Sequence, residues 1–157
     1  MGVEIRRARP EDAPEACVVM RRSIAELCAA DHRNNEAILS RWLANKTVEH
    51  FTAWLADPHN AVLVATEDGA ILAVGAVRDT GEITLNYVSP DARFRGVSRA
   101  MLAALEAQAC GYGRTRCTLR STETARRFYH DAGYVDDGPP AGNFGTDTGY
   151  PMVRQLA

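Results

Sequence analysis

Three arginines and one glycine are grouped between Arg93 and Arg99, where a predicted strand ends and a predicted helix begins. The first N–H groups of a helix have no partner inside the helix, and the helix dipole is positive at that end. Gly96 leaves room for a ligand to approach the backbone. The stretch therefore predicts an anion-binding site. It lacks the Gly-Lys-Ser/Thr ending that marks the phosphate loop of the nucleotide hydrolases.

A second informative stretch, Ala125 to Tyr134, lies on the next predicted helix, one strand further along the chain. Tyr129 stands near its centre, and Gly133 ends the helix. A tyrosine hydroxyl can donate a proton, whereas its ring can pack a helix against a sheet. Both interpretations of Tyr129 stay open.

Taken together, Arg-x-x-Gly-x-Ser at Arg93 to Ser98 and Ala-x-x-Phe-Tyr-x-x-x-Gly-Tyr at Ala125 to Tyr134 resemble the two acetyl-CoA signatures of the GNAT N-acetyltransferase superfamily. The run Val88-Ser89-Pro90 before the first signature is also similar to that family. Two positions depart from its pattern: Ser98 stands where Gly or Ala is usual, and Thr122 where Asn is frequent.

The resemblance implies transfer of an acetyl group from acetyl-CoA to a primary amine, by direct attack while both substrates are bound. Backbone N–H groups from Phe94 to Arg99 would hold the pyrophosphate, and Arg93, Arg95 or Arg99 would add charge. The backbone of Tyr87 and Val88 would pair with the pantetheine arm as an added strand does. The implied cofactor site comprises Tyr87, Val88, Arg93, Phe94, Arg95, Gly96, Val97, Ser98, Arg99, Thr122, Ala125, Phe128 and Tyr129.

Three residues have implied catalytic roles. The Val88 N–H would polarise the thioester carbonyl and stabilise its oxyanion. Tyr129 would protonate the departing thiolate, a transfer that costs roughly 2 kcal/mol from a phenol of ordinary pKa. Glu82, at the start of the strand leading to Val88, would take the proton of the amine directly or through water. Glu82 can equally be an ordinary charged residue at a strand start.

Two other functions compete with this one. A non-catalytic module that senses acyl-CoA needs the stretch from Arg93 to Arg99 but not Tyr129. A hydrolase built on Ser121, His130 and Asp131 is rejected, because Ser121 lacks a Gly-x-Ser-x-Gly elbow and adjacent residues point to different faces of a helix.

The acceptor is expected to be a small-molecule or peptide amine bound between residues 29–46 and 137–150, and a homodimer stays open. Four acidic side chains in or next to these segments can attract an ammonium group or simply be surface charge; they are Asp31, Glu36, Asp136 and Asp137. Arg126 and Arg127 are either ligands of the nucleotide's phosphate or a solvated helix face.

The apolar spacing predicts a short strand at 4–8, then helices from Asp12 to Cys28, around 38–43 and from Thr47 to Pro58. Hairpin strands follow at 61–66, 70–78 and 82–88, then a helix at 97–109, a strand at 116–121 and a helix at 122–132. A loop from Asp137 to Gly149 precedes a last strand at 150–156. This order predicts an α/β (α+β) fold with a mixed, mostly antiparallel sheet and helices on both faces, the acyl-CoA N-acyltransferase fold of the resemblance.

Composition supports one globular domain spanning residues 1–157, with 46% hydrophobic and 24% charged residues. A net charge of −2 gives no reason to expect nucleic acid as a partner. No apolar run is long enough for a membrane span, the first residues do not form a secretory signal, and the predicted location is cytoplasmic. Four separated cysteines and four scattered histidines predict reduced thiols and no metal site.

Overall fold

A computed structural model of the chain describes residues 2–143 and 146–156. The strands are β1 (Glu4–Arg7), β2 (Asn60–Glu67), β3 (Ala70–Arg78), β4 (Glu82–Val88), β5 (Arg116–Ser121), β6 (Val135–Asp136), β7 (Ala141–Asn143) and β8 (Thr146–Gln155). The helices are α1 (Ala13–Leu27), α2 (Ala29–His32), α3 (Glu36–Leu43), α4 (Val48–Ala56), α5 (Val97–Gly111) and α6 (Arg126–Asp131), with single-turn 3₁₀ helices η1 (Pro10–Asp12) and η2 (Pro90–Ala92).

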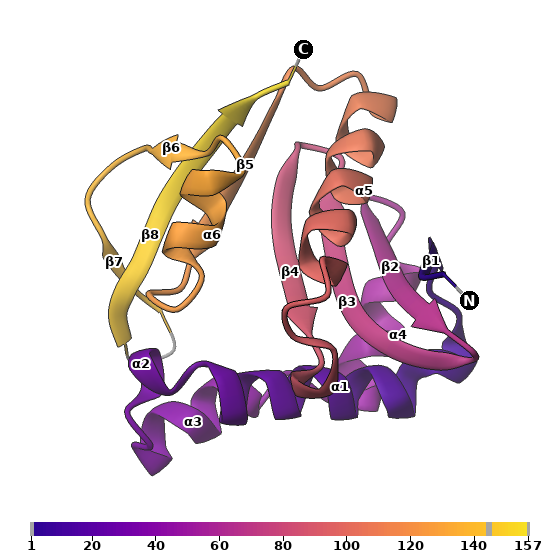
Figure 1. Cartoon of the computed structure of the whole chain (residues 1–157), viewed down its shortest axis with the longest axis horizontal. Coiled ribbons are helices and arrows are strands. Elements are labelled where there is room, and N and C mark those ends of the chain that lie inside the picture. The colour runs from indigo at the N-terminus through magenta and orange to yellow at the C-terminus, as the bar shows by residue number, and fades with distance from the viewer. Residues whose placement is uncertain (1, 144–145, 157) are drawn as a thin grey trace.

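The strands form one sheet in the order β1-β2-β3-β4-β5-β8-β6, with β7 paired to β8. Every pair is antiparallel except β4 and β5, which run parallel because α5 connects them as a crossover. These two strands are joined at one end only, through Glu82↔Thr118 and Ile83↔Leu119. Beyond that point they diverge, and the sheet opens in a V above α1 (Figure 1).

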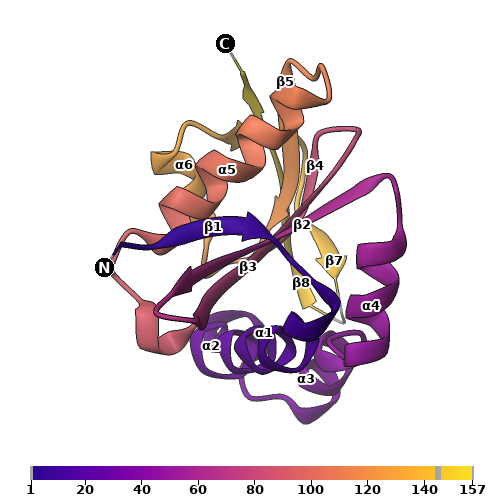
Figure 2. The same ribbon diagram turned by 90° about the vertical axis from the view of Figure 1, so that its right-hand side faces the viewer.

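Helices cover both faces of the sheet, as the sequence predicts (Figure 2). On one face, α5 packs its apolar side chains, among them Met101 and Leu105, against β2, β3 and β4. On the other face, α1 and α4 bury Met20 and Phe51 against the same strands. The two cores meet the sheet on opposite sides of β4, so this strand is fixed from both faces. None of the described helices is long and apolar enough to cross a membrane.

Several predicted boundaries need correction. The turn Thr122 to Ala125 is not helical, and α6 begins only at Arg126; within the turn, the Thr122 hydroxyl accepts a hydrogen bond from the Ala125 N–H. The predicted loop from Asp137 to Gly149 contains β7 and the start of β8, while residues 144 and 145 lie outside the described residues. A Cβ at position 149 would lie 2.7 Å from the Ala141 carbonyl oxygen, so glycine allows the close pairing there.

The start of α1 is held by contacts from outside the helix. Asp12 occupies the position before the helix, but its carboxylate does not cap it. The carboxylate instead binds the Arg6 guanidinium at 2.8 Å and accepts a hydrogen bond from the Arg9 N–H. These contacts hold the pKa of Asp12 below its usual value and fix β1 against the start of α1.

Candidate active site

One cavity of about 360 Å³ lies at the open end of the V, where β4 ends and α5 begins. All of the residues predicted for the site line this cavity, except Glu82 and Arg95. The Arg95 guanidinium instead contacts the Glu67 carboxylate at 2.8 Å, at the end of β2. The two sequence signatures, more than twenty residues apart in the chain, therefore converge on one cavity.

The beginning of α5 provides the anion-binding features of the cavity. Gly96 stands immediately before the helix with φ = 77°, in the left-handed region that glycine adopts without strain. A Cβ at Gly96 would have no neighbour within 4 Å, so the backbone is open to a ligand. Within the described chain, the N–H groups of Val97, Ser98 and Arg99 donate no hydrogen bond. The helix dipole and these three donors favour a negative group at this place.

Phe94 and Arg93 form the outer wall of the same cavity. Phe94 also has a left-handed backbone, φ = 63°, although it is not glycine, and 92% of its surface is exposed. The Arg93 guanidinium lies 4.6 Å from the centre of the Phe94 ring. A planar cation stacked on an exposed ring gives this wall both positive charge and apolar surface.

The last residues of β4 direct backbone groups into the V. The Ser89 N–H donates to the Leu72 carbonyl at 2.7 Å, and the register with β3 continues through Ala73↔Val88 and Val74↔Tyr87. Because hydrogen bonds alternate between the two edges of a strand, the Val88 N–H points away from β3, toward the side where β5 has diverged. By the same alternation the backbone N–H and C=O groups of Asn86 point into the V, whereas those of Tyr87 form hydrogen bonds with β3. Tyr87 thus reaches the cavity through its side chain.

A β-bulge at Thr84 decides which side chains of β4 face α6. The pairs Val77↔Ile83 and Ala76↔Leu85 leave Thr84 without an opposite residue. Ile83 consequently belongs to the core beneath α5, and Leu85 to the core above α1. Regular alternation would place these two side chains on the same face. After the bulge, Asn86 lies on the side of Tyr129.

Tyr129 is 6% exposed and lies in the cavity wall. The Asn86 amide donates a hydrogen bond to its hydroxyl oxygen at 3.2 Å, which leaves the hydroxyl hydrogen free for another acceptor. Burial raises the pKa of Tyr129 to about 12, and the Asn86 hydrogen bond opposes this shift. The ring also packs edge-on against Phe128 and Tyr134. Both sequence interpretations of this residue are therefore compatible with its place.

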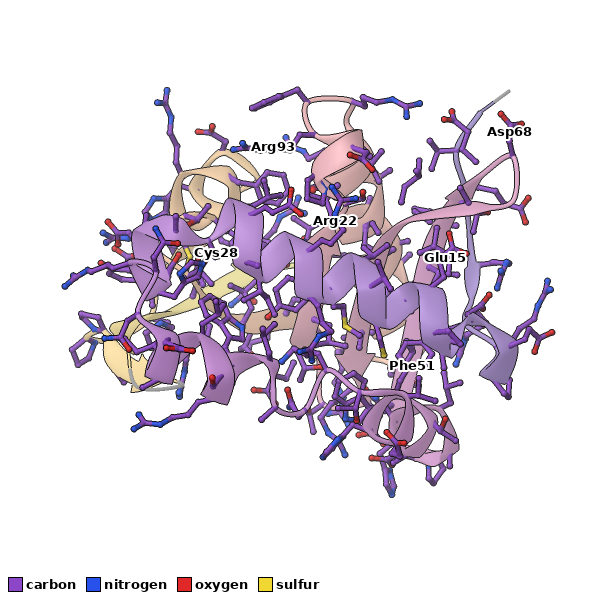
Figure 3. The ribbon with its side chains drawn as sticks, turned by 90° about the horizontal axis from the view of Figure 1, so that it is seen from below. Glu15, Arg22, Cys28, Phe51, Asp68 and Arg93 are labelled. Carbon is purple, nitrogen blue, oxygen red and sulfur yellow. The ribbon has the colours of Figure 1, made fainter. Side chains whose placement is uncertain are left out.

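The end of α1 closes the cavity from below and was missed by the sequence analysis. Ser23, Leu27 and Cys28 line it, and burial raises the pKa of the Cys28 thiol to about 12, which disfavours the thiolate. Figure 3 shows Cys28 near the end of α1 and Arg22 earlier in the same helix, facing the segment that precedes α5. The Arg22 guanidinium contacts the Asp91 carboxylate at 2.8 Å and so connects α1 to η2.

Asp31 is buried, contrary to its interpretation as surface charge. Its carboxylate accepts hydrogen bonds from the Glu123 N–H at 2.6 Å and from the hydroxyl and N–H of Thr124. Asp31 therefore anchors the turn before α6 to α2. The Asp136 carboxylate contacts Arg126 and His130, and the Arg126 guanidinium also lies 4.2 Å from the centre of the Tyr150 ring.

Glu82 lies at the other end of β4, in a second cavity of about 350 Å³ on the side of α3 and α4. It lies six positions before Val88 on the strand, a separation of roughly 20 Å. A narrow space of about 70 Å³ between β4 and β5 borders both cavities. It shares Asn86 and Tyr129 with the first cavity and Arg120 with the second. We refer to it as the passage.

Comparison with known proteins agrees with this geometry. Residues 28–154 match the family described as the acetyltransferase (GNAT) domain. The chain belongs to the GNAT acetyltransferase family. An uncharacterised N-acetyltransferase of Mycobacterium tuberculosis is 30% identical to this GNAT chain over 159 aligned positions, which cover 92% of this chain and 98% of the relative.

Two solved structures extend the likeness of this GNAT protein to the whole fold. A GCN5-related N-acetyltransferase from Rhodopseudomonas palustris is 26% identical, with a TM-score of 0.87 over 99% of this chain and 97% of its own. The PaiA N-acetyltransferase of Thermoplasma acidophilum, solved in complex with coenzyme A, is 17% identical, with a TM-score of 0.86 over 99% of this chain and 100% of its own. The mixed sheet with one parallel pair is thus the GNAT fold.

Proposed function

We propose that the protein transfers an acetyl group from acetyl-CoA to a primary amine, with Val88 and Tyr129 at the reaction centre. The observation that carries this proposal is the meeting of two unlike groups in one cavity. The Val88 N–H points into the V without a strand to pair with, and the Tyr129 hydroxyl lies in the wall of the same cavity. A donor for a developing oxyanion and a donor for a leaving thiolate suit acyl transfer.

The residues around the cavity fit the chemical parts of acetyl-CoA. The N–H groups of Val97, Ser98 and Arg99, which have no acceptor within the described chain, suit a pyrophosphate, and Arg93 adds positive charge beside them. The backbone of Asn86 and Val88, facing the V, can pair with the amide groups of the pantetheine arm. Acetyl-CoA supplies the acetyl group as a thioester, which an amine can attack without further activation of the acid.

The transfer balances as one acyl substitution. The amine nitrogen forms a bond to the thioester carbonyl carbon, and the carbon–sulfur bond breaks. The Val88 N–H donates a hydrogen bond to the carbonyl oxygen while negative charge develops on it. Tyr129 donates its hydrogen bond to the departing sulfur, because Asn86 leaves the hydroxyl hydrogen available. The sulfur leaves as the thiolate of coenzyme A, which the Tyr129 hydrogen bond stabilises and which takes a proton from water to become the free thiol.

The amine must lose a proton in the same reaction. Glu82 borders the second cavity, roughly 20 Å from Val88 along the strand, so water in the passage would have to carry the proton to its carboxylate. The second cavity is also the expected acceptor side, because Trp42, Asn45 and Lys46 of the segment predicted for the acceptor line it. The amine would then reach Val88 through the passage.

An amine panel tests the proposed function. The purified protein is mixed with acetyl-CoA and single amines, and the release of free thiol and the mass of the acetylated amine are measured. We expect thiol release that depends on an amine. If acetyl-CoA stabilises the protein against heat but no amine of the panel causes thiol release, the protein is a binding module instead.

A further inference from the structure

We propose that the acceptor is a small molecule that carries a carboxylate as well as the reacting amine, and that Arg120 and Lys46 bind this carboxylate. The inference rests on the proposed function and adds the chemical class of its acceptor. It follows from the charges that line the second cavity, from their partners and from the position of the passage.

Positive charge predominates in the second cavity. Lys46, Arg78 and Arg120 line it, and Glu82 is the acidic residue among its lining side chains. Asp57 neutralises Arg78, since its carboxylate lies 3.1 Å from the guanidinium. The guanidinium of Arg120 has no hydrogen bond or ion pair with any described residue. An arginine fork left without a partner at a cavity matches the two oxygens of a carboxylate.

Lys46 adds a second cation deeper in the same cavity. It is the sole lysine of the sequence, and its side chain is 2% exposed. The ammonium donates hydrogen bonds to the Trp42 carbonyl oxygen at 3.3 Å and to the Asn45 amide oxygen at 2.6 Å, and it lies 5.9 Å from the centre of the Tyr87 ring. A cation out of contact with water attracts an anion more strongly than an exposed one does.

The passage gives the acceptor its orientation. Arg120 borders both the second cavity and the passage, whereas Tyr129 and Asn86 border the passage and the first cavity. A carboxylate held at Arg120 therefore leaves the remainder of the acceptor directed along the passage. Its volume of about 70 Å³ admits a short chain with a terminal amine. The amine end then arrives beside Val88 and Tyr129.

Matched pairs of acceptors test the proposal. Amino acids with chains of different length are compared with their primary amides, which keep the amine and the shape but lose the negative charge. We expect kcat/KM for acids to exceed that for amides at least about tenfold, and Arg120→Gln to remove this difference by lowering the value for acids alone. Lys46→Met should act in the same direction. Arg41→Gln, an exposed arginine of α3 outside the three cavities, should keep the preference.

A binding measurement separates this proposal from the proposed function. In the presence of coenzyme A, acids should raise the melting temperature of the wild-type protein, amides should not, and Arg120→Gln should abolish the rise. If acids bind in this way while no amine is acetylated, the acceptor class holds and the reaction is wrong. If amides or polyamines are acetylated as well as acids, the reaction holds and the acceptor class is wrong. The absence of both binding and turnover would overturn both.

Discussion

At the scale of single residues, burial changes what Tyr129 can do. With a pKa near 12, full proton transfer to a thiolate would cost about 5 kcal/mol, against roughly 2 for an ordinary phenol. In the proposed reaction, Tyr129 would therefore act as a hydrogen-bond donor that stays protonated from pH 7 to pH 9. Tyr129→Phe should lower kcat roughly 10²-fold, and this factor should be the same at every pH from 7 to 9. The affinity for acetyl-CoA should change little. Steady-state kinetics and a binding titration measure both quantities.

Asn86 provides a matched control for this prediction. Asn86→Asp keeps the shape of the side chain but can only accept hydrogen bonds when ionised, so the Tyr129 hydroxyl must donate to it. The hydroxyl hydrogen is then no longer available to the departing sulfur, and kcat should fall although Tyr129 is intact. A normal kcat in both variants would mean that Tyr129 serves only to pack α6 against the sheet.

At the scale of elements, two substitutions at the start of α5 distinguish the effect of charge on cofactor binding from the effect of shape. Gly96→Asp and Gly96→Asn place nearly identical side chains in the same left-handed position, and each should lower the free energy of unfolding by about 1 kcal/mol. The new side chain would point into open space beside the N–H groups of Val97, Ser98 and Arg99 that have no acceptor within the described chain. The aspartate should repel the pyrophosphate and remove the stabilisation by acetyl-CoA, whereas the asparagine should keep most of it. Thermal melts with and without acetyl-CoA give the comparison, and equal shifts in the two variants would place the pyrophosphate elsewhere.

Elements whose signals are local could be predicted from the sequence, and elements fixed by tertiary contacts could not. Thr47 caps α4 through a hydrogen bond from the His50 N–H, and Asp68-Gly69 turns β2 into β3, as the sequence indicates. The bulge at Thr84 has no such signal, because it is visible only in the pairing with β3. Asn86 was therefore missed as the partner of Tyr129. The turn before α6 depends on a contact across the chain in the same way, because the Asp31 carboxylate accepts a hydrogen bond from the Glu123 N–H.

At the scale of the whole molecule, the divergence of β4 from β5 produces the site. The strands stay joined where Ile83 meets Leu119, and the V widens from there toward α1. The core beneath α5 contains Tyr129 and Tyr134 as well as Leu105, so the α6 side of the V is part of the same packed interior. Glu106 accepts a hydrogen bond from the Tyr134 hydroxyl and contacts Arg154, which ties α5 to β8 across the junction. The cavity walls are thus fixed by interior contacts on both sides.

This dependence on buried phenols predicts how the whole fold responds to alkaline pH. Burial raises the pKa of Tyr87, Tyr129 and Tyr134 above the value near 10 that unfolded chains have. Below pH 10 both states keep these protons, so the phenols do not change stability with pH. Above pH 10 the unfolded chain releases protons that the fold retains, and stability falls as pH rises.

The size of the effect makes it measurable. At pH 11 each of the three phenols should lower the free energy of unfolding by about 1.4 kcal/mol, about 4 kcal/mol together, a large part of the stability of a typical domain. Burial of the thiols of Cys28 and Cys117 acts in the same direction from a lower pH, whereas the lowered pKa of Lys46 acts in the opposite direction between about 8 and 10.5. Urea unfolding at pH 9 and pH 11 should show the fall, and tyrosinate absorbance should rise together with unfolding. Tyr129→Phe should reduce the fall by about 1.4 kcal/mol, a third of the part that the three phenols contribute. Ionisation of all five tyrosines near pH 10 in a protein that is still folded would contradict the burial on which the proposed site depends.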